Sequence, residues 1–129
     1  MQNKITKRLF NKKSYILGGL GLIGSSISKK FFENGSRIII LDKDKNNFNK
    51  FLTKNKIKSR DIVFTKFDCT NLKNIEKNLN KIIIKNGCPD IFINASYPFS
   101  KNWSKNNFNQ IKLSYYNDEI SNQLNSSIW

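Results

Sequence analysis

Four short apolar runs alternate with three segments of helical periodicity in the first hundred residues, and no other feature of the sequence constrains the fold as strongly. The apolar runs cover residues 14–18 (SYILG), 37–42 (RIIILD), 61–68 (DIVFTKFD) and 89–96 (PDIFINAS). The helical segments between them cover 22–34, 44–56 and 71–87, and a further helix is expected over 115–129. This alternation predicts an α/β fold, in which a parallel sheet carries helices on both faces through right-handed crossovers.

The periodicity also predicts which side chains reach the core. In the helix expected over 22–34, the apolar face consists of Ile23, Ile27 and Phe31. The outward face of the same helix consists of Ser25, Ser28, Lys29 and Glu33. The apolar positions of the segment 71–87 are Leu72, Ile75, Leu79 and Ile82. The uninterrupted run 37–42 predicts a strand that is covered on both faces.

A glycine-rich loop, GGLGLIG, joins the first strand to the first helix. It contains G-x-G-x-x-G at Gly19, Gly21 and Gly24, and G-x-x-G-x-x-G when counted from Gly18. The early glycines allow a tight turn, Gly21 lets the backbone approach a pyrophosphate, and Gly24 lets the helix pack closely. The first helical turn, which starts with Leu22 and Ile23, offers N–H groups and the positive end of a helix dipole to phosphates.

An acid follows at the end of the second strand. Asp42 lies 18 residues after Gly24, close to the separation of about 20 expected for an acid that binds the adenosine ribose. A carboxylate there would repel a 2′-phosphate, which favours NAD, while Lys43 and Arg37 keep NADP as the alternative. Asp42 has a second interpretation, as the N-cap of the following helix. The context predicts a Rossmann-type doubly wound parallel sheet over 14–129, after a basic leader at 1–13.

Two further strand ends extend the pattern. Asp68 ends the third run in FDCT, and the fourth run ends in Ile93-Asn94-Ala95-Ser96. Together with the glycine loop, these residues resemble the short-chain dehydrogenase/reductase family. The resemblance implies that Asp68 and Cys69 contact adenine and that Asn94 and Ala95 line the cofactor cleft. The resemblance is incomplete, because the family has N-N-A-G after the fourth strand, whereas this chain has Ile93 in place of the first Asn and Ser96 in place of the Gly.

Each of these polar residues also has a structural interpretation. Asp68 is a candidate cap for a helix that opens at Asn71, and Asn94 is a candidate for closing the turn after the strand. The stretch NASYP followed by KNWSKNNF is similar to a subgroup of the family encoded in surface-polysaccharide and flagellin-modification clusters.

The resemblance implies NAD(P)-dependent hydride transfer between a nicotinamide and the hydroxyl or carbonyl of a small, possibly sugar-related, substrate. The family's chemistry depends on a Ser and a Tyr-x-x-x-Lys pair beyond a fifth strand. Tyr97 and Lys101 have that spacing, but they directly follow the fourth strand and Pro98 interrupts them, so they are not expected to be catalytic. The family's helix Asn aligns with Gln123, and Asn122 and Asn125 are close to that position.

The fifth strand and the catalytic pair are not found in the sequence. We therefore expect the cofactor-binding half of a longer enzyme, ending after the helix that follows the fourth strand and inactive alone. A nucleotide-binding module without chemistry is the alternative. An oligomer is left open.

Composition limits the other function classes. The chain has 23 Lys and Arg against 9 acids, a net charge of +14, but the lysines are scattered, so nucleic-acid binding is the weaker interpretation. There is no His, and the two Cys form no C-x-x-C, which argues against a metal site or a disulfide framework and favours a reducing, cytoplasmic compartment. An export signal over 15–32 is the alternative, but four glycines make a poor apolar helix. No apolar run is long enough for a membrane span.

Overall fold

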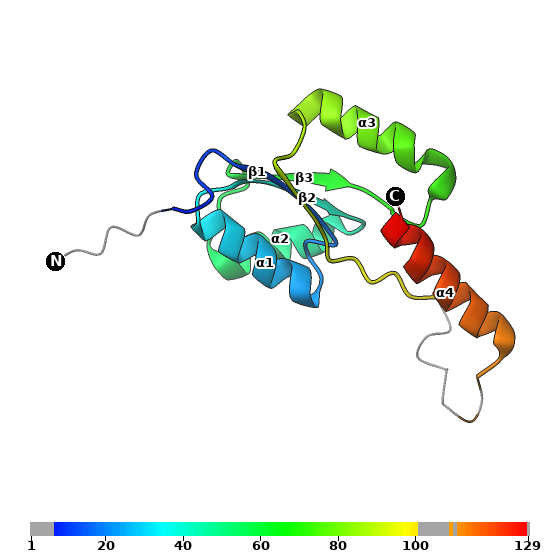
Figure 1. Cartoon of the computed structure of the whole chain (residues 1–129). Coiled ribbons are helices and arrows are strands. Elements are labelled where there is room, and N and C mark those ends of the chain that lie inside the picture. Colours follow the sequence, from blue (N-terminus) through cyan, green and yellow to red (C-terminus); the bar gives the residue numbers. More distant parts are fainter. Residues whose placement is uncertain (1–6, 101–108, 110, 129) are drawn as a thin grey trace.

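The structure is a computed structural model that describes residues 7–100, 109 and 111–128. In it the chain folds around one parallel sheet (Figure 1). Its strands are β1 (Lys13–Leu17), β2 (Arg37–Asp42), β3 (Ile62–Lys66) and β4 (Ile91–Asn94). They lie in the order β3-β2-β1-β4, and all neighbouring pairs are parallel. The helices are α1 (Leu22–Glu33), α2 (Lys45–Asn55), α3 (Ile75–Asn86) and α4 (Leu113–Ile128). The predicted α/β class and parallel sheet are confirmed.

The central strand β2 is covered on both faces, as its uninterrupted apolar sequence predicts. Successive side chains of a strand point to opposite faces. Ile38 and Ile40 accordingly pack with the apolar side chains of α1 and α2, whereas Ile39 and Leu41 pack with those of α3. Figure 1 shows α1 and α2 on one side of the sheet and α3 on the other.

Two predicted helix faces are wrong in detail. Ser28 was expected to face outward, but it is fully buried and its hydroxyl donates to the Gly19 carbonyl at 2.9 Å. Ile23 was expected in the core, but its side chain is 68% exposed. The physical reason is that α1 approaches the glycine loop through its small residues Gly24 and Ser28, which leaves the apolar side chains of its first turn exposed. Leu72 is also outside the core, because a 3-10 turn (Leu72–Asn74) precedes α3.

The segment that could have been an export signal is part of the folded domain. Residues 15–32 form most of β1, the glycine loop and most of α1. Within the described ranges, no helix has both the length and the hydropathy of a bilayer-spanning segment.

Tyr15 connects the sheet to the end of α3. Its side chain is 1% exposed, and its hydroxyl donates to the Gly87 carbonyl at 2.6 Å. We expect Tyr15→Phe to lower the free energy of unfolding by about 1–2 kcal/mol, because the partly buried Gly87 carbonyl loses its donor. Chemical denaturation followed by circular dichroism measures this difference. Tyr116→Phe, at a side chain that is 54% exposed, is the control and should change little.

The same contact gives a pH dependence. Burial and the nearby Cys88 raise the pKa of Tyr15 above its ordinary value of 10.0, and Arg37 opposes them. The folded chain therefore keeps the phenol proton to a higher pH than the unfolded chain, and this contribution to stability is lost as pH rises above about 10. The stability gap between wild type and Tyr15→Phe should narrow over that range. A gap that widens there would contradict the assignment.

Candidate functional site

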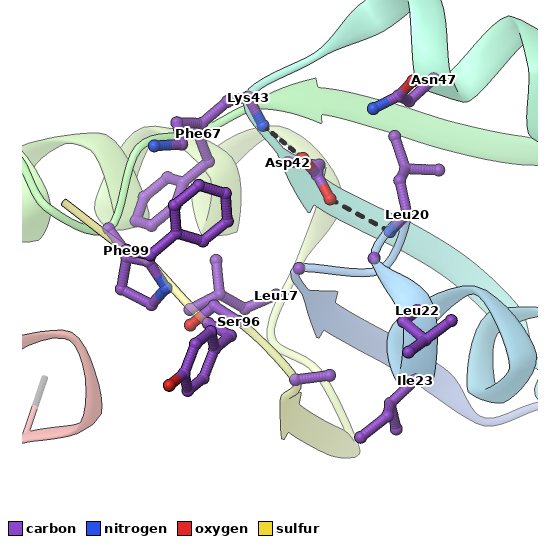
Figure 2. Close-up of a pocket in the computed structure, with 16 residues that line it drawn as sticks. Leu17, Leu20, Leu22, Ile23, Asp42, Lys43, Asn47, Phe67, Ser96 and Phe99 are labelled. Atoms are coloured by element: carbon purple, nitrogen blue, oxygen red, sulfur yellow. Dashed lines mark hydrogen bonds between the residues drawn. The ribbon is translucent and has the colours of Figure 1, made fainter. Parts of the chain in front are cut away.

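A cavity of about 560 Å³ lies at the carboxyl ends of the strands. Its walls come from the glycine loop, the ends of β1 and β2, the segment after β3 and the segment after β4 (Figure 2). β2 and β3 lie on one side of β1 and β4 lies on the other, so the cavity is at the point where the strand order reverses. Ligands of open α/β sheets bind at such points.

The glycine loop requires its glycines at two close approaches. Gly18 has a φ of +70°, and a Cβ there would lie 2.6 Å from the Cα of Ser96, just beyond β4. Gly24 lies in the first turn of α1, where a Cβ would overlap the Gly18 carbonyl oxygen. Gly24 therefore does not line the cavity but lets α1 lie against the loop that does.

Gly21 presents the start of α1 to the cavity. It is the N-cap residue, with φ −70° and ψ −178°, and having no side chain it caps no N–H group. The first turn of a helix leaves N–H groups without intrahelical partners, and here the first turn carries no acidic side chain. The positive end of the helix dipole is therefore uncompensated beside the cavity, which favours an anion.

Asp42 places a carboxylate at the end of β2. Its Oδ2 accepts from the Leu20 backbone N–H at 3.0 Å, and its Oδ1 accepts from that of Lys43 at 2.7 Å (Figure 2). Each oxygen keeps a lone pair for a further donor. The alternative interpretation of Asp42 as a helix cap is wrong, because Asp44 caps α2 by accepting from the Asn46 N–H at 2.7 Å.

Asp68 forms a local turn outside the cavity lining. Its Oδ1 accepts from the Thr70 backbone N–H at 2.9 Å and from the Thr70 hydroxyl at 2.7 Å. Burial alone would raise the pKa of Asp68, but these hydrogen bonds and the charge of Lys43 hold it below its ordinary value. The side chain caps no helix, so that alternative is wrong as well.

Cys69 reaches the cavity from the segment after β3. Its side chain is buried and lines the cavity wall. Burial raises the pKa of the thiol above its ordinary value, against a hydrogen bond with Ser96. Cys69 is therefore a neutral thiol near pH 7.

The residues after β4 continue the wall. Asn94 Oδ1 accepts from the Ser96 backbone N–H at 3.0 Å and from the Ser96 hydroxyl at 2.6 Å, so Asn94 does close the turn. Ala95 lines the cavity, and its N–H donates to the Leu17 carbonyl at 2.8 Å. Asn94 itself is not a lining residue.

The cavity also has an aromatic and apolar wall that is not among the residues predicted from the sequence. Phe67 follows β3, and Tyr97, Pro98 and Phe99 follow β4. α4 fixes the segment after β4, because Gln123 Nε2 donates to the Pro98 carbonyl at 2.8 Å and Glu119 Oε1 accepts from the Ser100 N–H at 2.6 Å. The aromatic residues directly after two strand ends were the available signal.

The predicted site residues therefore separate into two groups. Those that line the cavity are Gly18, Gly21, Leu22, Ile23, Asp42, Cys69 and Ala95. Those that do not line it are Gly19, Gly24, Asp68, Asn94 and Gln123. Gln123 contacts the wall at Pro98. Tyr97 lies in an irregular segment, and Lys101 lies outside the described residues. In the described part of the chain, no cluster of three metal-ligating side chains occurs.

This arrangement defines a Rossmann-type domain, and comparison with known proteins specifies the family. The sequence profile of the short chain dehydrogenase family matches residues 12–128. The chain belongs to this family, as its motifs predict.

Similar proteins agree with this assignment. Post-translational flagellin modification protein A of Campylobacter coli is 27% identical over 122 residues, which are 91% of this chain and 44% of that protein. The crystal structure of gox2181 matches with a TM-score of 0.74 at 20% identity, over 95% of this chain and 46% of that one. A short chain dehydrogenase from Bacillus anthracis matches with a TM-score of 0.69 at 22% identity, over 96% of this chain and 47% of that one. At these identities the two structures show a shared fold. The chain spans less than half the length of each of these three proteins.

Proposed function

We propose that the chain binds NAD(H) in the cavity at the carboxyl ends of the strands, as the cofactor-binding part of a short-chain dehydrogenase. The observation that carries the proposal is the pairing of an uncompensated helix N-terminus with a carboxylate. The start of α1 and Asp42 line the same cavity, at the point where the strand order reverses. A dinucleotide needs an anion site for its pyrophosphate and an acceptor for its ribose hydroxyls, and this cavity offers both.

Each part of the cofactor has a matching set of residues. We assign the pyrophosphate to the N–H groups at Leu22 and Ile23, which line the cavity, and the missing side chain of Gly21 would leave room for it. The carboxylate of Asp42 accepts from the ribose hydroxyls. The buried side chains of Leu17 and Phe67 supply an apolar wall for a ring. When bound, the nicotinamide would accept or donate the hydride.

The position of Asp42 favours NAD over NADP. Its two oxygens are fixed by backbone N–H groups, so the carboxylate cannot easily turn away from a 2′-phosphate. Lys43 lines the same cavity and reduces that repulsion. We therefore expect NADH to bind more tightly than NADPH, with NADPH still measurable.

Fluorescence titration of the purified chain with NADH tests the proposal. We expect saturable binding, and we expect Asp42→Ala to weaken it by at least about tenfold, because hydrogen bonds to a charged group contribute about 1.5–3 kcal/mol. Asp44→Ala is the matched control. It removes a neighbouring carboxylate that caps α2 and does not line the cavity, so it should cost stability without changing NADH affinity. A folded chain that does not bind NADH would overturn the proposal.

The activity of the longer protein is a further part of the proposal. We propose hydride transfer between the nicotinamide and a hydroxyl or carbonyl, with residues beyond this chain completing the reaction, and a cytoplasmic location. A sugar-related substrate is proposed from the similarity to a flagellin modification protein. Assay of the chain alone should show cofactor binding without turnover.

A further inference from the structure

A second cavity lies between α1 and α2, and it is lined mainly by lysines and other polar side chains, whereas the lining of the first is mainly apolar. We call it the α1–α2 groove; its volume is about 430 Å³. Both helices lie on the same side of the sheet (Figure 1). The groove borders the first cavity, since Leu20 and Asn47 line both.

Three lysine side chains line this groove, and no carboxylate is among its lining residues. They belong to Lys29 on α1 and to Lys50 and Lys54 on α2. Lys29 pairs with Glu33 at 3.9 Å, but both side chains are about half exposed, and such pairs contribute little. Within the described residues, neither Lys50 nor Lys54 has an ion pair. Being four residues apart on one helix, these two repel each other.

The rest of the lining suits an anion that is bound from one side. Ser26 adds an exposed hydroxyl and Asn47 adds an amide beside the lysines. The buried ring of Phe51 closes the groove toward the core. An anion placed there would meet donors from two helices and would relieve the repulsion between the lysines.

We propose that the α1–α2 groove binds a small anion carrying at least two phosphate charges, of the pyrophosphate or phosphomonoester class, as a ligand additional to the cofactor. Three lysine charges around one groove favour a multivalent anion over a single carboxylate. These lysines line one groove between two helices rather than a stripe along the surface, which favours a small anion over a nucleic-acid backbone. The inference does not depend on NAD(H) binding in the first cavity.

Calorimetric titration with inorganic pyrophosphate tests the groove, with variants that separate it from the glycine loop. We expect Lys50→Gln/Lys54→Gln to weaken pyrophosphate binding by at least about tenfold and to weaken it further as salt rises. The matched control is Lys77→Gln/Lys81→Gln, which removes the same charge from exposed positions on α3, across the sheet. Gly21→Asp places a carboxylate at the start of α1 and blocks pyrophosphate there, so the binding that remains in this variant should be that of the groove. Melting curves verify that each variant is folded.

The outcomes are distinct. The inference is supported if Lys50→Gln/Lys54→Gln (the α2 pair) loses pyrophosphate binding while Lys77→Gln/Lys81→Gln (the α3 pair) and Gly21→Asp keep it. This outcome supports the inference even if the wild type fails to bind NADH. Loss in Gly21→Asp with retention in the α2 pair assigns the anion to the glycine loop and overturns it. Equal weakening in the α2 and α3 pairs indicates non-specific charge and overturns it. A selective loss of NADPH affinity in the α2 pair assigns the groove to the cofactor's 2′-phosphate, which also overturns it. The inference is also overturned if a single-stranded oligonucleotide binds more tightly than pyrophosphate and if both the α2 pair and the α3 pair weaken that binding.

Discussion

Gly24→Ala is expected to lower the free energy of unfolding by about 3 kcal/mol, the upper part of the usual range for overpacking. A Cβ at Gly24 would overlap the Gly18 carbonyl oxygen and lie 3.0 Å from the Gly19 Cα. These contacts are backbone atoms, which cannot rotate away as a flexible side chain does. The Gly18 carbonyl is also held in place, because it accepts from the Gly21 N–H at 3.0 Å.

The sign of this effect separates two physical contributions. Alanine is a better helix former than glycine by about 1 kcal/mol, so propensity alone predicts stabilisation at a helical position. The overlap with the loop predicts the opposite, and it should be larger. Chemical denaturation of both proteins measures the net effect.

Gly21→Ala is the matched control within the same loop. Its φ of −70° suits any residue, and its Cβ would meet only the Gly18 carbonyl oxygen, at 3.3 Å. We expect Gly21→Ala to cost at most about 1 kcal/mol, because Ala is a poorer N-cap than Gly. If Gly24→Ala were as stable as Gly21→Ala, the close approach of α1 to the loop would be wrong.

The sheet could be predicted from the sequence because its strands are buried on both faces. The run Ile38–Leu41 cannot be a surface segment, and its neighbours repeat the pattern at intervals that suit helical crossovers. The carboxyl ends of the strands then place the glycine loop and Asp42 together without any knowledge of side-chain packing.

The orientation of α1 could not be predicted from hydropathy. A count of apolar positions assigns Ile23 to the core and Ser28 to solvent, whereas the structure does the reverse. What decides is size: Gly24 and Ser28 are small enough for the loop to pack against, and the Ser28 hydroxyl is satisfied by the Gly19 carbonyl. Small residues repeated every four positions were the signal that periodicity of apolar residues does not detect.

The aromatic residues after the strand ends signal a wall, but the position of the segment after β4 could not be predicted from local patterns. Tyr97, Pro98 and Phe99 lie in an irregular segment whose position depends on Glu119 and Gln123, at sequence separations of 19 and 25 residues. No periodicity links these partners. Likewise, two acids close together, Asp42 and Asp44, divide the roles of cavity carboxylate and helix cap, and only geometry distinguishes them.

Gly21→Asp is expected to abolish NADH binding in the range that the wild type saturates, while the fold is kept. Gly21 is the N-cap of α1 with extended ψ, a position where Asp is among the preferred residues and Gly is only slightly worse. The new carboxylate would accept from the first-turn N–H groups and occupy the place of the pyrophosphate with a like charge. The affinity for NADH should fall at least about a hundredfold, because both the donors and the space are lost.

The free energy of unfolding of Gly21→Asp should be equal to that of the wild type or higher, although the affinity for NADH falls. A side-chain cap and a negative charge at the start of α1 both favour the helix, by a few tenths to about 1 kcal/mol. Gly21→Asn separates charge from shape, since Asn has nearly the same size, is also a preferred cap and carries no charge. We expect Gly21→Asn to lose less affinity than Gly21→Asp in the same fluorescence titration. If Gly21→Asp bound NADH as the wild type does, the cofactor's pyrophosphate would lie elsewhere, and the start of α1 would be only a turn.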